Sequence, residues 1–172
     1  SPLLPACAPV DLNDLPGLRT ELAKGDVAGF IVEPIQGKGV HMATDEFLIG
    51  AAAACKEHES LFILDEVQTG LGRTGKLFAR EHSGVVPDIL VMSKALSGGY
   101  VPVGAVMTRR DVFLKVFSSM ERCVVHSSTF GQGAFAMVAG LATLQVIDEE
   151  KLVENAQRMG DLLTRGLLDL KE

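Results

Sequence analysis

The stretch FILDEVQTGLGRTGKLFAREHSGVVPDILVMSKALSGGYVPVG, residues 62–104, decides the fold of this chain. Two apolar runs in it, residues 62–64 and 89–92, have the length and the flanks of buried parallel strands. The first run is followed by Asp65, and the second is followed, one residue later, by Lys94. Ligands in open α/β sheets bind just beyond the carboxyl ends of the strands. The acid and the lysine therefore stand where such a fold places its chemistry.

Motifs in this stretch and beside it resemble those of a known family. They are VEPIQG (32–37), LDEVQTGLGRTG (64–75), PDILVMSKALSGG (87–99) and HSSTFG (126–131). In order and spacing they resemble the class III pyridoxal-phosphate (PLP) aminotransferases of fold type I, which include the ornithine, acetylornithine and ω-amino acid enzymes. The resemblance runs from about Val27 to the C-terminus. It implies a three-layer α/β/α fold with a mostly parallel sheet, of which this chain is part of the large domain.

The resemblance also implies a reaction, in which an amino group moves from an amino acid or primary amine to a 2-oxo acid. Lys94 would form the Schiff base with the aldehyde of PLP and, once displaced by substrate, would move the proton. Asp65 would keep the pyridine nitrogen protonated, so that the ring can take up electrons. Without the resemblance, a salt bridge between two loop residues is the simpler interpretation of this pair. An aminomutase or a decarboxylating relative stays open, because the same anchors serve several reactions.

Further residues take cofactor-binding roles. By the resemblance, Val67 packs on one face of the ring, although ordinary core packing fits it equally, and Gln68 bonds the phenolic oxygen. Thr129, with Ser128, would bind the phosphate of the other subunit's cofactor, which implies a homodimer with shared active sites. The two hydroxyls could instead cap the following helix. Glu33, at the end of a strand, fits a cofactor contact and a loop-anchoring acceptor equally well.

Two positions depart from the family pattern. At the position of Lys38, ornithine- and γ-aminobutyrate-type members carry a glutamate, which gates an arginine elsewhere in the site. A lysine cannot pair with that arginine. The simpler interpretation of Lys38 is a solvated lysine on a surface turn. Gln132-Gly133-Ala134 replaces the usual Gly-Asn-Pro, so the family's geometry after Thr129 is not carried over.

The loop at residues 70–76 also matches two nucleotide-binding motifs, which we reject. Its G-x-G-x-x-G pattern needs a long helix that faces a pyrophosphate, but only residues 76–82 are available for one. Its G-x-x-x-x-G-K pattern is followed by Leu77, which lacks the hydroxyl that a magnesium ion needs. In addition, Asp65 and Glu66 stand directly before the loop and would repel phosphates.

Composition sets the remaining limits. The 172 residues are 47% hydrophobic with a net charge of −6, which fits one α/β domain and argues against a nucleic-acid partner. No apolar run approaches membrane-spanning length, so we expect no membrane partner. The three cysteines are widely spaced and the four histidines show no ligand pattern. We therefore expect no metal site and a reduced, cytoplasmic protein.

We expect residues 1–172 to be a partial PLP-binding large domain, because family members are much longer. Residues 1–26 indicate a lead-in and a first helix, interrupted near Pro16-Gly17. Residues 150–172 indicate a strongly amphipathic helix leading into a missing C-terminal domain. The other predicted elements are strands at 28–32 and 103–108 and helices at 45–58, 111–117 and 134–148. The second hypothesis is a catalytically silent, truncated domain that acts as an assembly module.

Overall fold

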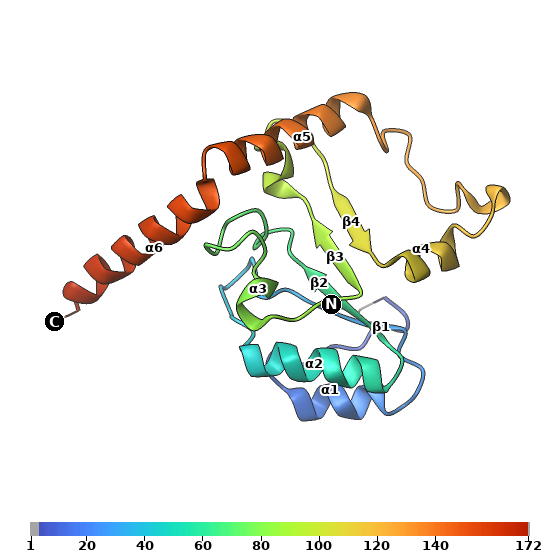
Figure 1. Ribbon diagram of the computed structural model, residues 1–172. Coiled ribbons are helices and arrows are strands. Elements are labelled where there is room, and N and C mark those ends of the chain that lie inside the picture. The colour runs from blue at the N-terminus through green and yellow to red at the C-terminus, as the bar shows by residue number, and fades with distance from the viewer. Residues whose placement is uncertain (1–3, 172) are drawn as a thin grey trace.

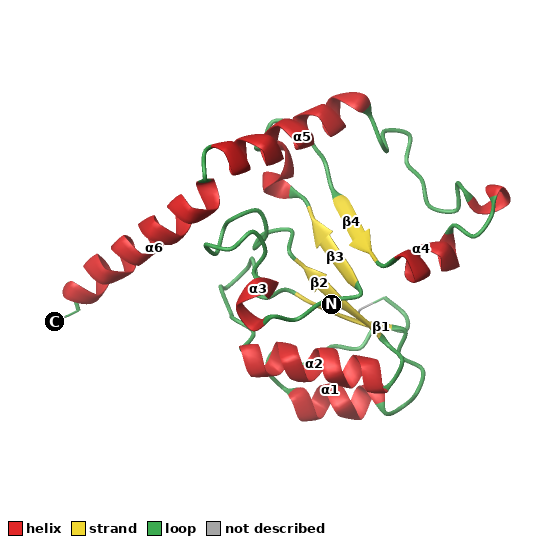
Figure 2. Ribbon diagram, viewed as in Figure 1, coloured by secondary structure: helices red, strands yellow, loops and turns green. Residues whose placement is uncertain are grey.

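The apolar runs of the central stretch form neighbouring strands of one sheet in the computed structural model, which describes residues 4–171 (Figures 1 and 2). In chain order the elements are α1 (Leu15–Leu22), β1 (Gly29–Val32), α2 (Asp45–Glu57), β2 (Leu61–Asp65), α3 (Arg80–Ser83), β3 (Ile89–Met92), η1 (Lys94–Ser97), β4 (Ala105–Thr108), α4 (Arg110–Val116), η2 (Met120–Arg122), α5 (Ala134–Glu149) and α6 (Leu152–Asp169). The predicted lead-in begins, and the predicted last helix ends, outside the described residues.

The sheet has the order β1-β2-β3-β4, with the first three strands parallel and β4 antiparallel to β3. In the register, Val32 lies opposite Leu64, and Leu64 lies opposite Leu90. The three parallel strands therefore end at one edge, and the candidate site residues follow them there. The prediction of an α/β fold with a mostly parallel sheet, including its antiparallel last strand, is confirmed.

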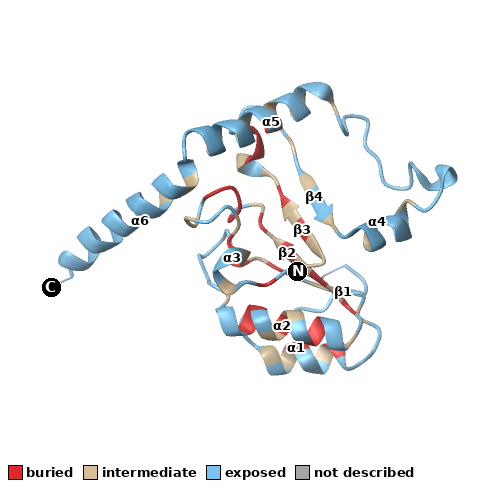
Figure 3. Cartoon of the chain, in the orientation of Figure 1, coloured by how far each residue is buried: buried red, intermediate tan, exposed pale blue. Residues whose placement is uncertain are grey.

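Helices cover one face of this sheet. The side chains of Phe62 and Leu64 point to this face and are buried against Ala51 and Ala54 of α2, whose small side chains let the helix approach the sheet closely. Helix α1 packs beside α2 and adds Leu18 to the same core. Figure 3 shows that the buried residues gather in these helices, the strands and the loops beside them.

The opposite face of the sheet carries apolar side chains that no described helix covers. Ile31 in β1 is 59% exposed and Val106 in β4 is 65% exposed. Helix α5 packs on η1, and α6 extends away from the sheet (Figure 1). No residue of α6 is buried, although the whole helix is described. The described residues therefore supply one of the two outer layers, and the predicted amphipathic stripe of α6 is exposed.

The first helix differs from the prediction. It begins at Leu15 and runs without a break to Leu22, so the predicted interruption near Pro16 was wrong. Proline is well suited to the first turn of a helix, where its missing N–H needs no partner. The Asp14 side chain accepts a hydrogen bond from the Gly17 N–H at 3.0 Å and caps this helix start. By contrast, the predicted cap of α2 is confirmed, since Thr44 Oγ1 accepts from the Phe47 N–H at 3.1 Å.

Residues 4–171 contain neither a membrane-spanning helix nor a cluster of metal-binding side chains. No helix there has both the length and the apolar composition needed to span a bilayer. No cluster of three or more histidine, cysteine or acidic side chains there is placed to hold a metal ion.

Cys55 in α2 is expected to resist alkylation in the native chain, whereas Cys7 and Cys123 should react. Its thiol is fully buried, and this burial, with the negative charge of Asp88, raises its pKa to about 11. Cys7 and Cys123 are exposed, and the thiolate is the reactive form. Treatment with iodoacetamide before and after unfolding in urea, followed by peptide mass mapping, tests this. Equal labelling of Cys55 before unfolding would mean that α2 does not stay packed on the sheet.

Candidate active site

Lys94 is held in an unusual backbone conformation at the end of β3. Its φ is +43°, in the left-handed region that non-glycine residues adopt rarely and at a cost of about 1–3 kcal/mol. Hydrogen bonds on both sides hold this conformation. The Ser93 hydroxyl donates to the Val103 carbonyl at 2.6 Å, and the Leu96 N–H donates to the Ser93 carbonyl at 2.9 Å. Such strained positions cluster at functional sites, and this one carries the predicted catalytic amine.

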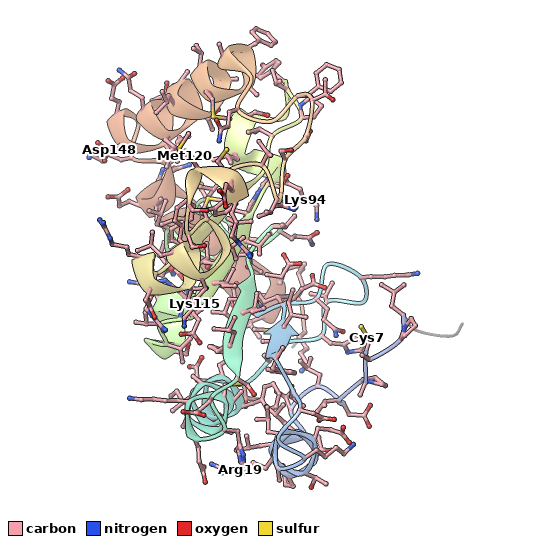
Figure 4. The ribbon with its side chains drawn as sticks, turned by 90° about the vertical axis from the view of Figure 1, so that its right-hand side faces the viewer. Cys7, Arg19, Lys94, Lys115, Met120 and Asp148 are labelled. Carbon is pink, nitrogen blue, oxygen red and sulfur yellow. The ribbon has the colours of Figure 1, made fainter. Side chains whose placement is uncertain are left out.

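The amine of Lys94 meets Gln68 in a pocket. Lys94 Nζ donates to Gln68 Oε1 at 2.8 Å, and both side chains line a pocket of about 430 Å³ with Ile35 and Ala95. Figure 4 shows Lys94 projecting from the upper part of the sheet, far from Arg19 on α1 at the bottom. The structure therefore brings two predicted site residues from neighbouring strand ends into contact.

Asp65 lies beside this pocket and not in it. Its carboxylate accepts a hydrogen bond from the Val67 N–H at 3.0 Å, which turns the chain sharply toward Gln68. Asp65 and Glu33 line a neighbouring cavity of about 240 Å³. The two cavities are close, since Ile35 lines the first and the next residue lines the second. A salt bridge between Asp65 and Lys94 is absent from the described residues, so the simple ion-pair interpretation of this pair is not supported.

Glu66 points in the opposite direction from Asp65, because successive side chains of a strand alternate between the two faces. It is only 1% exposed. Its carboxylate accepts hydrogen bonds from Thr69 Oγ1 at 3.0 Å, from the Ala79 N–H at 2.7 Å and from the Arg80 N–H at 2.8 Å. Glu66 therefore anchors both ends of the loop between β2 and α3. The sequence analysis did not predict that Glu66 is a buried anchor of this loop. The alternation of inward and outward side chains along β2, continued by one residue, was the signal that could have predicted it.

Glu33 anchors a second loop against Gln68. Its carboxylate accepts from the Gly37 N–H at 2.8 Å. A Cβ atom at Gly37 would lie 2.7 Å from Gln68 Oε1, so only glycine lets this loop approach the side chain so closely. The observed contact is that of a loop-anchoring acceptor, and a direct cofactor contact of Glu33 stays a prediction. Lys38 follows as an exposed turn residue, as the surface interpretation expects.

Ser128 and Thr129 lie apart from Lys94. Both are exposed in the long loop between η2 and α5, which Figure 1 shows extending away from the sheet. Ser128 Oγ accepts from the Phe130 N–H at 3.3 Å, and neither residue lines the pocket of Lys94. The alternative that they cap α5 was wrong, because the helix begins after Gly133 without a side-chain cap. Their predicted action on the other subunit's cofactor stays a prediction.

Three polar residues of the Lys94 pocket were missed by the sequence analysis, namely Thr69, Arg73 and Thr74. All three come shortly after Gln68 within the family motif at residues 64–75, but no site role was predicted for them. The rejection of the G-x-G-x-x-G nucleotide motif agrees with the structure, since α3 after the loop has four residues. The signal that was available was the position of the loop, immediately after a strand that carries a site residue.

Comparison with known proteins identifies the family. A family profile described as aminotransferase class-III matches residues 8–172. The rat protein named ornithine aminotransferase, mitochondrial, is 42% identical over 170 residues, which are 98% of this chain and 38% of that protein. Aminotransferase PigE of Serratia sp. (strain ATCC 39006) is 42% identical over 170 residues, which are 98% of this chain and 20% of that protein.

Solved structures agree with the profile. Ornithine aminotransferase from Toxoplasma gondii, which is described with partial occupancy of PLP at its active site, matches with a TM-score of 0.90 and 40% identity, over 97% of this chain and 38% of that one. Acetylornithine aminotransferase from Elizabethkingia anophelis matches with a TM-score of 0.85 and 42% identity, over 94% of this chain and 40% of that one. This chain thus spans well under half the length of these relatives. With the predicted motifs, the predicted fold and a profile match over nearly its whole length, the chain belongs to the class-III aminotransferases.

Proposed function

We propose that residues 1–172 form part of the cofactor-binding domain of a longer PLP-dependent transaminase. The observation that carries this proposal is the contact of Lys94 Nζ with Gln68 Oε1, in a pocket at the carboxyl ends of two parallel strands. The family of the chain supports it, as do relatives that are named ornithine or acetylornithine aminotransferases. The proposed reaction moves an amino group from an amino acid or primary amine to a 2-oxo acid.

The residues present fit PLP. A pocket of about 430 Å³ lies within the range of small-molecule sites, about 300–1,000 Å³. It offers a primary amine and an amide, while a carboxylate that can face a pyridinium nitrogen, Asp65, stands at the adjoining strand end. Bound PLP would supply a ring that accepts electrons from the substrate.

Each side chain then has a defined task. Lys94 would hold the cofactor through Nζ and, once displaced by the substrate, would carry the proton that the substrate gives up. Gln68 orients that Nζ through its hydrogen bond without forming an ion pair with it. Asp65 would accept the pyridinium N–H, and its own bond to the Val67 N–H fixes its carboxylate. Val67 lies between Asp65 and Gln68 in the chain and is half-buried. Its side chain would pack on the ring.

The proposal extends to partners and location. Ser128 and Thr129 lie on an exposed loop and do not line the pocket of their own Lys94, which supports their use across a homodimer. The partners of the reaction are an amino donor and a 2-oxo acid acceptor. We place the protein in the cytoplasm on the strength of its three cysteines, none of which forms a disulfide.

Reductive trapping tests the proposal. The purified chain is mixed with PLP, reduced with borohydride and digested, and the modified peptide is located by mass spectrometry. One modified peptide that contains Lys94 is the expected result. Modification spread evenly over the exposed lysines, including Lys38 and Lys76, would count against a cofactor site.

The alternative, a catalytically silent assembly module, has one observation in its favour. Helices α5 and α6 expose apolar side chains, among them Leu141 at 67% and Leu163 at 65%. Such a module would give no specific adduct at Lys94, and it would associate with itself as its concentration rises. The trapping experiment separates the two functions, and light scattering over a concentration series checks the self-association that the module requires.

A further inference from the structure

The loop at residues 70–75, which we call the glycine loop, has no role in the proposed function, yet it forms one wall of the Lys94 pocket. Arg73 and Thr74, near its tip, line that pocket. We propose that Arg73 binds the carboxylate of the substrate, an amino acid or a 2-oxo acid, next to Lys94. This inference rests on the proposed function and adds the group that recognises the substrate.

The charge of Arg73 is not neutralised within the part of the chain that the structure describes. Its guanidinium takes part in none of the ion pairs and side-chain hydrogen bonds of residues 4–171, whereas Arg19 pairs with Glu57 and Arg109 pairs with Asp88 and Asp111. No acidic residue lines the Lys94 pocket. The pocket therefore presents two cationic groups, one from Arg73 and one from Lys94, and no anion of its own.

The backbone that carries Arg73 is fixed on both sides. Glu66 receives hydrogen bonds from Thr69 before the glycine loop and from the Ala79 N–H after it. Helix α6 packs on the loop from outside, since a Cβ atom at Gly75 would lie 2.2 Å from Gln157 Oε1. Gly75 also has a φ of +80°, a conformation that a side chain would oppose. Arg73 is thus an exposed cation on a fixed base, which reduces the ordering cost of binding.

The position of Arg73 favours a carboxylate over the cofactor phosphate. The fork of an arginine matches the oxygens of both groups, so the choice between them depends on what lies beside Arg73. Gln68, the predicted partner of the phenolic oxygen of PLP, lines the same pocket as Arg73. In PLP the phenolic oxygen and the phosphate arm lie on opposite sides of the reacting carbon, so a group beside Gln68 reaches the substrate and not the phosphate. The proposed function assigns the phosphate to Ser128 and Thr129 of the other subunit.

The first test measures carboxylate binding without any turnover. The chain with isotope-labelled arginine is titrated with glutarate, an unreactive dicarboxylate, and with the neutral glutaramide, and the Arg73 side-chain N–H signal is followed by NMR. Arg73→Gln identifies the signal by its loss. We expect a saturable shift with glutarate and none with glutaramide. An equal response to both compounds, or no response to glutarate, would overturn the proposal.

Matched variants sharpen this test, with the backbone N–H signals of Lys94 and Ala95 as reporters. Arg73→Lys keeps the charge and loses the fork, and should weaken glutarate binding about tenfold, whereas Arg73→Gln should weaken it about 10- to 100-fold. Lys76→Gln removes the same charge from an exposed position just after the glycine loop and outside the pocket. Binding that falls equally in Lys76→Gln and Arg73→Gln would point to general attraction of anions and would contradict a specific site.

A second experiment separates the carboxylate from the cofactor phosphate. Arg73→Gln is trapped with borohydride in the presence of PLP or of pyridoxal, which lacks the phosphate. We expect the labelling of Lys94 by each compound to match that of the unaltered chain. Selective loss of labelling by PLP would assign Arg73 to the phosphate and overturn our proposal. Absence of labelling in the unaltered chain would instead contradict the proposed function, while the glutarate titration would still decide on Arg73.

Discussion

Replacing Lys94 by alanine is expected to remove all specific labelling of the chain by PLP and borohydride. Labelling requires an amine that condenses with the aldehyde, and Lys94 Nζ is the amine in the pocket with Gln68. Lys94→Arg should fail equally, although it keeps the positive charge, because a guanidinium stays protonated and does not condense with the aldehyde. Mass mapping of the reduced, digested protein measures the effect.

The control for this prediction is Lys76→Ala, which removes an exposed lysine of the neighbouring loop. Its labelling at Lys94 should equal that of the unaltered chain. Circular dichroism of each variant must show the same helix content, so that a loss of label is not a loss of fold. A persistent modified peptide in Lys94→Ala, at the original yield, would show that another amine is the true anchor.

Replacing Glu66 by glutamine is expected to cause a large loss of stability. The carboxylate is buried and accepts three hydrogen bonds. Glutamine keeps one acceptor oxygen and turns an N–H₂ group toward a backbone N–H, so at least one donor loses its partner. A buried group without its partner costs about 1–3 kcal/mol, and more where a charged acceptor is lost. We expect the free energy of unfolding to fall by about 3 kcal/mol.

Thr69→Val is the matched control for Glu66→Gln. It removes one of the three donors to Glu66 and leaves both backbone donors in place, so we expect a loss of about 1 kcal/mol. Urea unfolding followed by circular dichroism measures both variants at the same pH. Equal losses in the two variants would mean that the bonds to the Ala79 and Arg80 N–H groups contribute little.

The sequence was sufficient to predict the strands, because each is a short apolar run bounded by polar or turn residues. The predicted strand at residues 28–32 differs from β1 by one residue, and the predicted strand at residues 89–92 coincides with β3. The start of α1 was harder, since a proline fits both the first turn of a helix and the break of one. In that case the cap at Asp14 decided the outcome.

The candidate site was predictable only in part. The strand ends predicted that Asp65 and Lys94 would stand at neighbouring strand ends, and the family resemblance added Gln68, which is the residue that contacts Lys94. The sequence did not reveal that Asp65 and Glu66 separate into an exposed cavity and the core, although strand alternation implies it. It also missed Arg73, because the pocket wall depends on how Glu66 folds the glycine loop back beside Gln68. That path is set by tertiary hydrogen bonds and leaves no local pattern.

The left-handed backbone at Lys94 has a consequence for how substitutions there should be interpreted. At a φ of +43° the conformational energy of a glycine is lower than that of any residue with a side chain. We therefore expect a glycine at position 94 to make the folded chain more stable than the native lysine does. Under the proposed function, this position would trade stability for activity, because its local conformational energy is kept high while its amine stands in the pocket.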